Sequence, residues 1–144
     1  MKKRTLSFMA ALMLLGVSIL HAQSAPIPAQ LITAKTVFLS NAGTGSNADN
    51  KYSTLGYNDF YSQLTAWNHY QLVLLPANSD LIMELTSNPG LLTLSIRDPK
   101  SSTILWTLSE QVKFWHSEKG IEKNMGAAAA KLVDDLKTLL KRNN

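Results

Sequence analysis

The histidines are the first side chains in this 144-residue sequence that could do chemistry. Two of the three, His69 and His116, lie beyond the N-terminal 22 residues. A metal site or a general base needs a converging carboxylate or second histidine, and neither histidine has such a partner four residues away. We expect both to be partly exposed residues at the ends of elements. We predict no metal site, no cofactor and no catalytic residue.

Asp80 and Glu84 are the next candidates because they lie on the same side of a predicted strand. They could act as an acid and a base only if that side lined a cleft, and charge on the solvated face of an edge strand is the simpler interpretation. Asp98 precedes Pro99, where a carboxylate caps a turn. Trp106 has apolar neighbours, so we expect a core residue rather than a platform for a ligand.

Two familiar catalytic motifs are excluded. The run Gly43-Thr44-Gly45-Ser46 suggests a phosphate-binding loop, but such a loop requires Gly-Lys-Ser/Thr opening a helix, and Asn47 follows here. No serine lies in a Gly-x-Ser-x-Gly turn, so the sequence gives no support for a serine hydrolase.

The N-terminus has the three parts of a cleavable secretory signal. Lys2, Lys3 and Arg4 supply a positive start, and the uncharged apolar stretch 5–20 is too short for a permanent membrane span. Small Ala22 precedes the expected cut. We therefore predict a signal peptide over residues 1–22 and a mature protein in the periplasm or outside the cell.

Charge and cysteine content narrow the possible partners. Without the three basic residues of the signal, 11 basic and 10 acidic residues remain, and the formal net charge falls from +4 to +1. This dispersed charge predicts no nucleic-acid partner. The sequence has no cysteine, which excludes disulfides, thiolate zinc sites, a cysteine nucleophile and a lipidated cysteine anchor. We expect a soluble monomer with no membrane anchor after cleavage.

The mature chain is expected to be a flexible leader over 23–30 followed by one domain over 31–144. A strand is predicted over 31–40 and a polar loop over 41–54. Apolar residues at spacings of three and four then predict a helix that turns one face to the core: Tyr57, Phe60, Tyr61, Leu64 and Trp67.

Strands are predicted over 70–75 and 80–86, with turns at 76–79 and 87–90. Strict alternation over 92–97 and 104–109, around Asp98 to Ser102, predicts a β-hairpin whose inward set is Leu92, Leu94, Ile96, Ile104, Trp106 and Leu108. A long amphipathic helix is expected over 117–141. The fold class is therefore α+β, with a mixed or antiparallel sheet of about five strands and two helices packed on one face.

The runs 78–85, 92–98 and 104–106 resemble a family of small exported bacterial envelope proteins of unknown function. In that family an Ala-Asp-Leu strand, a strand ending in Asp, a short turn and a Leu-Trp strand precede a C-terminal helix. Many members are lipoproteins, and this sequence departs from them because it lacks cysteine. More distantly, the layout is similar to the N-terminal domain of the periplasmic protein TolB. Neither resemblance implies catalytic residues here.

Two functions remain open. The first is a non-catalytic envelope interaction module that binds an envelope protein or peptide, with a strand added to an exposed sheet edge. The alternative is a small-molecule or carbohydrate binder, or a weak hydrolase, that uses the 41–61 region with Tyr57 and Asp59, together with His69. A hollow in which Tyr57, Asp59 or His69 converge would favour the alternative. A polar surface with an uncovered edge strand would favour the interaction module.

Overall fold

A computed structural model of the chain describes residues 26–44, 50–88, 90–113 and 118–142. The predicted signal peptide, residues 23–25 of the predicted leader, His116 and the middle of the predicted 41–54 loop lie outside these ranges. Within them, none of the helices has the length and apolar character that crossing a bilayer requires.

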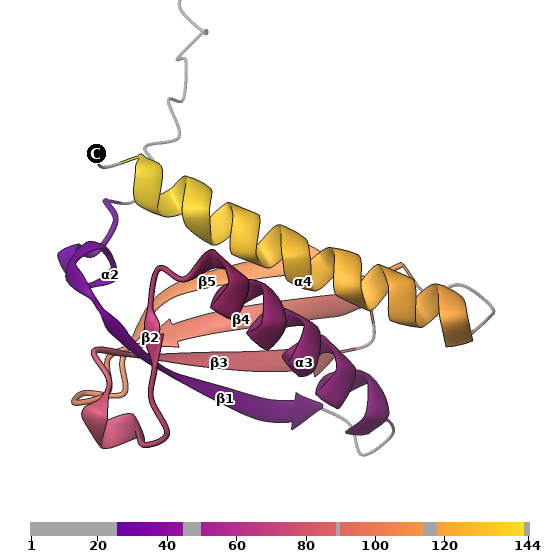
Figure 1. Cartoon of the computed structure of the whole chain (residues 1–144), viewed down its shortest axis with the longest axis horizontal. Coiled ribbons are helices and arrows are strands. Elements are labelled where there is room, and N and C mark those ends of the chain that lie inside the picture. The colour runs from indigo at the N-terminus through magenta and orange to yellow at the C-terminus, as the bar shows by residue number, and fades with distance from the viewer. Residues whose placement is uncertain (1–25, 45–49, 89, 114–117, 143–144) are drawn as a thin grey trace, which may run out of the picture.

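The described residues contain a five-stranded mixed sheet with the order β2-β1-β3-β4-β5 (Figure 1). Its strands are β1 (Thr36–Thr44), β2 (Gln71–Leu72), β3 (Leu81–Asn88), β4 (Leu91–Arg97) and β5 (Ile104–Gln111). Strand β1 is parallel to both of its neighbours, β2 and β3. The pairs β3–β4 and β4–β5 are antiparallel. The predicted α+β class with a mixed sheet is confirmed.

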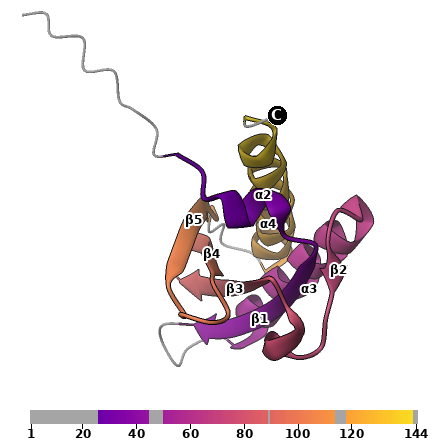
Figure 2. The same cartoon turned by 90° about the vertical axis from the view of Figure 1, so that its left-hand side faces the viewer.

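The helices are α2 (Ala29–Thr33), α3 (Asn50–Trp67) and α4 (Glu118–Lys141), and a 3-10 turn η1 covers Pro76–Asn78. Figures 1 and 2 show α3 and α4 side by side on one face of the sheet. The sheet is therefore covered on that face, which is the two-layer arrangement expected from the order of the elements.

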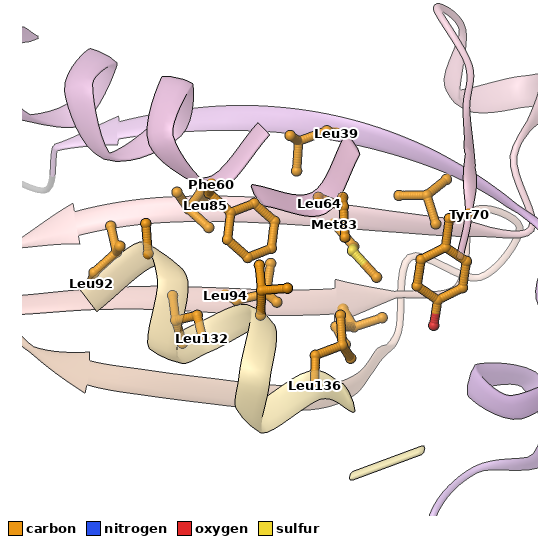
Figure 3. Close-up of a cluster of buried hydrophobic side chains, with 14 of the residues drawn as sticks. Leu39, Phe60, Leu64, Tyr70, Met83, Leu85, Leu92, Leu94, Leu132 and Leu136 are labelled. Carbon is orange, nitrogen blue, oxygen red and sulfur yellow. The ribbon is translucent and has the colours of Figure 1, made fainter. Parts of the chain in front are cut away.

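The core fills the space between this helix pair and the sheet (Figure 3). Strand β4 alternates strictly between buried and half-buried residues, and β3 does so up to its exposed last residue, Asn88, so one side of each strand faces the helices. The largest fully buried side chains are Phe60, Leu31, Leu64, Leu81, Met83, Leu85, Leu92, Leu94, Ile96, Met125, Leu132 and Leu136. The core is thus built from every layer of the fold.

The two strongest periodic patterns of the sequence correspond to elements of the structure. The predicted hairpin forms β4 and β5, and the predicted C-terminal helix forms α4 with its apolar stripe buried. Three details differ. Trp106 is only partly buried against the core, Ile104 is 50% exposed, and Tyr61, predicted on the core face of α3, is 46% exposed.

The N-terminal prediction of a strand over 31–40 is wrong in its first half. Ala29–Thr33 is helical and includes the last two residues assigned to the leader, and Leu31 is fully buried. The strand begins at Thr36 and continues to Thr44, into the predicted loop. A side chain closes this end of β1, because the Asn41 Oδ1 accepts hydrogen bonds from Gly43 N at 3.0 Å and Ser53 Oγ at 2.8 Å.

The predicted strand over 70–75 is reduced to the two residues of β2. Its N-terminal neighbour Tyr70 is buried, but Leu74 and Leu75 are 94% and 59% exposed. The chain leaves the sheet after the Val73 N–H donates to the Val37 carbonyl at 2.9 Å. Because Leu74 and Leu75 are apolar, the sequence pattern predicted a strand through them, but neither side chain packs in the core.

Candidate functional site

Strand β5 is the last strand of the sheet and has one neighbour, β4. Next to this pair, the Val112 N–H donates to the Gly90 carbonyl at 2.9 Å. In an antiparallel ladder, residues that bond to the partner strand alternate with residues whose N–H and C=O point away. Val112 and Gly90 form such a bonded pair, and the register between β4 and β5 is unshifted from there back to Trp106. Every second residue before Val112 therefore bonds to β4, and the backbone groups of the residues between them, Thr107, Ser109 and Gln111, point away from β4. They form an open edge.

The side chains of β5 give this edge little protection. Natural edge strands are blocked by lysines, prolines, bulges or very short length. Strand β5 has eight residues, no proline and no lysine. Its irregularity in register lies at the far end, opposite Ile96 and Arg97. The edge from Thr107 to Gln111 is therefore regular and able to pair.

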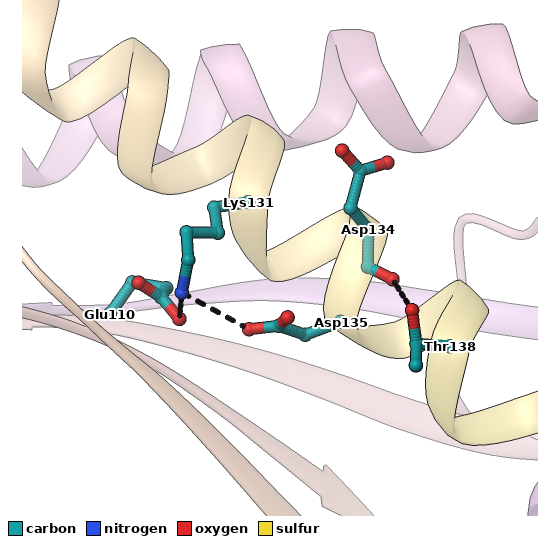
Figure 4. A network of polar contacts seen from close by, with 5 residues as sticks. All are labelled: Glu110, Lys131, Asp134, Asp135 and Thr138. Carbon is teal, nitrogen blue, oxygen red and sulfur yellow. Dashed lines mark hydrogen bonds and ion pairs between the residues drawn. The ribbon is translucent and has the colours of Figure 1, made fainter.

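The one charged side chain of β5 is engaged by the neighbouring helix (Figure 4). Glu110, whose side chain is 14% exposed, accepts a hydrogen bond from the Lys131 Nζ of α4. This bond raises the pKa of the Lys131 ammonium group. The Asp135 carboxylate also lies 3.7 Å from Lys131 Nζ. The charge of Glu110 is thus used to hold α4 on β5.

A hollow of about 190 Å³ lies beside this part of the edge, between β5 and α4. Its lining is Glu110, Gln111, Lys113, Asn124, Ala127, Ala128 and Lys131. The Asn124 Nδ2 donates to the Lys113 carbonyl at 2.6 Å and closes one end. Because the helix contributes two alanines here, a side chain of a segment paired with β5 would have room to enter.

Tyr57 and Asp59 lie on different sides of α3. The Tyr57 hydroxyl donates to the Leu39 carbonyl of β1 at 3.5 Å, and burial raises the pKa of Tyr57. Asp59 faces α4, since its carboxylate oxygen is 3.2 Å from the position that a Cβ on Gly126 would occupy. Burial also raises the pKa of Asp59. The two side chains thus have different neighbours, β1 for Tyr57 and α4 for Asp59.

His69 lies beyond the C-terminal end of α3, away from that pair. Its ring is nearly parallel to that of Trp67, with centroids 4.6 Å apart and an interplanar angle of 8°. Tyr70 contacts both rings edge-on, at 5.6 Å from Trp67 and 4.6 Å from His69. His69 is exposed, as expected for a residue at an element end. Its predicted binding role with Tyr57 and Asp59 stays a prediction.

The carboxylates considered as an acid–base pair have separate structural partners. Asp80 accepts hydrogen bonds from the backbone N–H groups of Lys35 and Thr36 at 2.8 and 2.9 Å, which lower its pKa. Glu84 forms an ion pair with Arg97 at 3.2 Å. This pair ties β3 to β4.

The turn before β5 is formed as the sequence predicted. The Lys100 N–H donates to the Asp98 carboxylate at 2.8 Å and lowers the pKa of Asp98. A polar hollow of about 290 Å³ lies between this turn and α2, and it is lined by Asp80 and Asp98 among others. Across the described ranges, no group of three or more histidine or acidic side chains is placed to hold a metal ion. Of the glycine-rich run, Gly43 lies in β1, and Gly45 and Ser46 are outside the described residues.

The fold and the edge define a small two-layer α+β domain with a mixed sheet. No protein-family model and no curated protein matches the sequence. Solved structures with a similar fold include PelC from Paraburkholderia phytofirmans, a dodecamer. Two of its structures have TM-scores of 0.56 and 0.54 and identities of 14% and 12%, and each match covers 78% of this chain and 94% or 92% of PelC.

A second similar structure is a Helicobacter pylori protein described as a neuraminyllactose-binding hemagglutinin homologue. Its TM-score is 0.53 and its identity is 16%, and the match covers 76% of this chain and 88% of that protein. At such identities these comparisons establish the fold alone.

Proposed function

We propose that this protein is a non-catalytic interaction module of the bacterial envelope, which binds an extended segment of another envelope protein along β5. The observation that carries the proposal is the open edge from Thr107 to Gln111. Three residues there direct unpaired backbone groups outward, and no lysine or proline blocks them. A partner strand would satisfy these groups and extend the five-stranded sheet.

The location outside the cytoplasm is supported by the N-terminal sequence rather than by the fold. A positive start, an apolar stretch and small Ala22 match the pattern of an exported protein. The resemblance of 78–106 to small exported envelope proteins supports the same location. PelC, which shares the fold, is a dodecamer, so a second copy of this chain is a competing occupant that the experiment must distinguish.

The edge itself can be blocked by one substitution. A proline at Thr107 removes an N–H that points away from β4, so the β4–β5 ladder keeps its bonds. Thr107→Ala removes the same exposed side chain but keeps the N–H, and is the matched control. We expect the proline variant to lose partner binding by about tenfold or more, and the alanine variant to bind as the parent does.

Binding is detected with a photo-crosslinking residue at Ser109 of β5, in the living bacterium, and with the same residue at exposed Gln63 of α3 as the control position. The crosslinked partner segment, identified by mass spectrometry, is then synthesised as a peptide. Its addition should slow hydrogen exchange at the N–H groups of Thr107, Ser109 and Gln111. Crosslinks to the chain itself would identify a second copy. Equal crosslinking from Gln63, or an unchanged yield with Thr107→Pro, would overturn the proposal.

A further inference from the structure

A hollow of about 250 Å³ lies between the C-terminal ends of α3 and α4, away from strand β5. The hollow is lined by the aromatic rings of Trp67 and His69, the aliphatic side chain of Leu140, and the ammonium groups of Lys137 and Lys141. This hollow shares no lining residue with β5 or with the hollow beside β5. The binding capacity of this site is therefore independent of the function proposed above.

The aromatic wall of this hollow is held rigidly. Trp67 and His69 stack at 4.6 Å, and the buried ring of Tyr70 supports both from the side. Asn68, between the two stacked residues, has a φ of 53°, in the left-handed region that asparagine tolerates better than most residues. This conformation turns the chain at the end of α3 and sets the His69 ring on Trp67. The contacts among the three rings thus fix the orientation of this wall.

The side of the hollow that α4 contributes is positively charged. Lys137 and Lys141 are four residues apart and therefore lie on the same side of α4. Lys137 Nζ lies 5.8 Å from the centre of the Trp67 ring and 3.0 Å from the Asp134 carboxylate, which is 71% exposed. Asp134 pairs with Lys137, and Lys141 adds a second ammonium group, so this side of the hollow keeps a net positive charge. Leu140, only 8% exposed, contributes an apolar surface between the walls.

We propose that this hollow binds a single six-membered ring that carries a carboxylate. The ring would pack against the aromatic wall and Leu140, and the carboxylate would pair with Lys137 and Lys141. Packing of the ring and a charge-assisted hydrogen bond to the carboxylate would both contribute to the binding free energy. The volume of about 250 Å³ is just below the usual range of small-ligand pockets, which fits one ring rather than a chain of rings. A sugar acid and an aromatic acid share this chemistry.

The test is a titration of the purified protein followed by the NMR signals of the Trp67 indole N–H and of the backbone around Lys137. Glucuronate represents a sugar acid and benzoate an aromatic acid. The controls are glucose, which has a ring but no carboxylate, and acetate, which has a carboxylate but no ring. We expect saturable shifts with glucuronate, benzoate or both, at millimolar concentrations, and at least tenfold weaker effects with glucose and acetate. Whichever ring carboxylate binds more tightly identifies the source.

Two variants test the charged wall without disturbing the core. Lys137→Gln and Lys141→Gln together should weaken binding by about tenfold or more, because both ammonium groups are lost. Lys123→Gln removes one exposed charge elsewhere on α4 and should change nothing. His69→Ala should weaken binding through the aromatic wall. The proposal is overturned if neither ring carboxylate shifts these signals, if acetate or glucose binds equally well, or if the lysine variant binds as the parent does.

Discussion

Phe60→Ala tests the way α3 is set against the sheet. Phe60 is fully buried, and it is the largest of the fully buried side chains. A phenylalanine buries roughly 150–250 Å² on folding, which at about 25 cal/mol per Å² corresponds to about 4–6 kcal/mol. Truncation to alanine leaves part of that area and opens a cavity, so the expected loss of unfolding free energy is about 3–5 kcal/mol.

The neighbouring residue supplies the control. Tyr61 is also aromatic and helical, and it was predicted on the core face, but it is 46% exposed. Tyr61→Ala should cost about 1 kcal/mol or less, since the side chain is nearly half exposed and loses mainly its stacking on the Tyr57 ring. Urea titration measures both losses, and a thermal melt should show a decrease of about 12–20 °C for Phe60→Ala, at about 4 °C per kcal/mol. Equal losses for the two variants would refute this orientation of α3.

Three further predictions concern single side chains. Burial raises the pKa of Tyr70 from 10.0 to about 12, so stability should be complete below pH 10 and fall as the pH rises towards 12; Tyr70→Phe, which also removes a buried hydroxyl with no partner, should abolish that fall in urea titrations across this range. The pKa of Asp80 is lowered by the N–H groups of Lys35 and Thr36, so its contribution is present above the ordinary value of 3.8 and lost on acidification. Asp80→Asn should therefore melt at a lower temperature at neutral pH, with a difference from the parent that shrinks as the pH falls below 3.8; a constant difference would contradict this. Trp106→Ala should cost about 1–3 kcal/mol in urea, because the ring is half-buried, and a loss as large as that of Phe60→Ala would place it in the core instead.

The sequence predicted best the long elements that bury one face and expose the other. Alternation in 92–97 is sustained over the whole of β4, and the stripe of α4 continues through six turns, so the period identifies both the element and its buried face. In β5 the alternation identifies the strand, but its first predicted inward residue, Ile104, is exposed. Helix α2 has five residues, too few for a period to be recognised, and its single buried residue is Leu31.

The polar end of β1 shows a different limit. Asn41 and Gly43 have low strand propensity, yet the strand continues because β3 offers backbone partners and Asn41 bonds to Ser53 of α3. Such support comes from segments distant in sequence, and propensity does not record it. Leu74 and Leu75 are the converse case, since apolar residues there are exposed.

The sites depended on information that a single sequence lacks. The sequence predicted β5 as a strand, but its place at the end of the sheet follows from the strand order. His69 was recognised as a candidate, whereas Lys137 and Lys141 were not recognised as site residues. Two helix ends that meet in space bring these residues together around one hollow.

The position of β1 in the sheet has a consequence for the order of folding. This strand comes early in the chain, but its two partners come later: Thr36 pairs with Gln71, and Val37 pairs with Leu81. Its ladder therefore requires large loops to close, whereas β3, β4 and β5 pair with their neighbours in sequence through short turns. A chain that crosses a membrane from its N-terminus would deliver β1 before any strand that can pair with it. The N-terminal part would stay extended during passage, and the sheet would be completed from its C-terminal half.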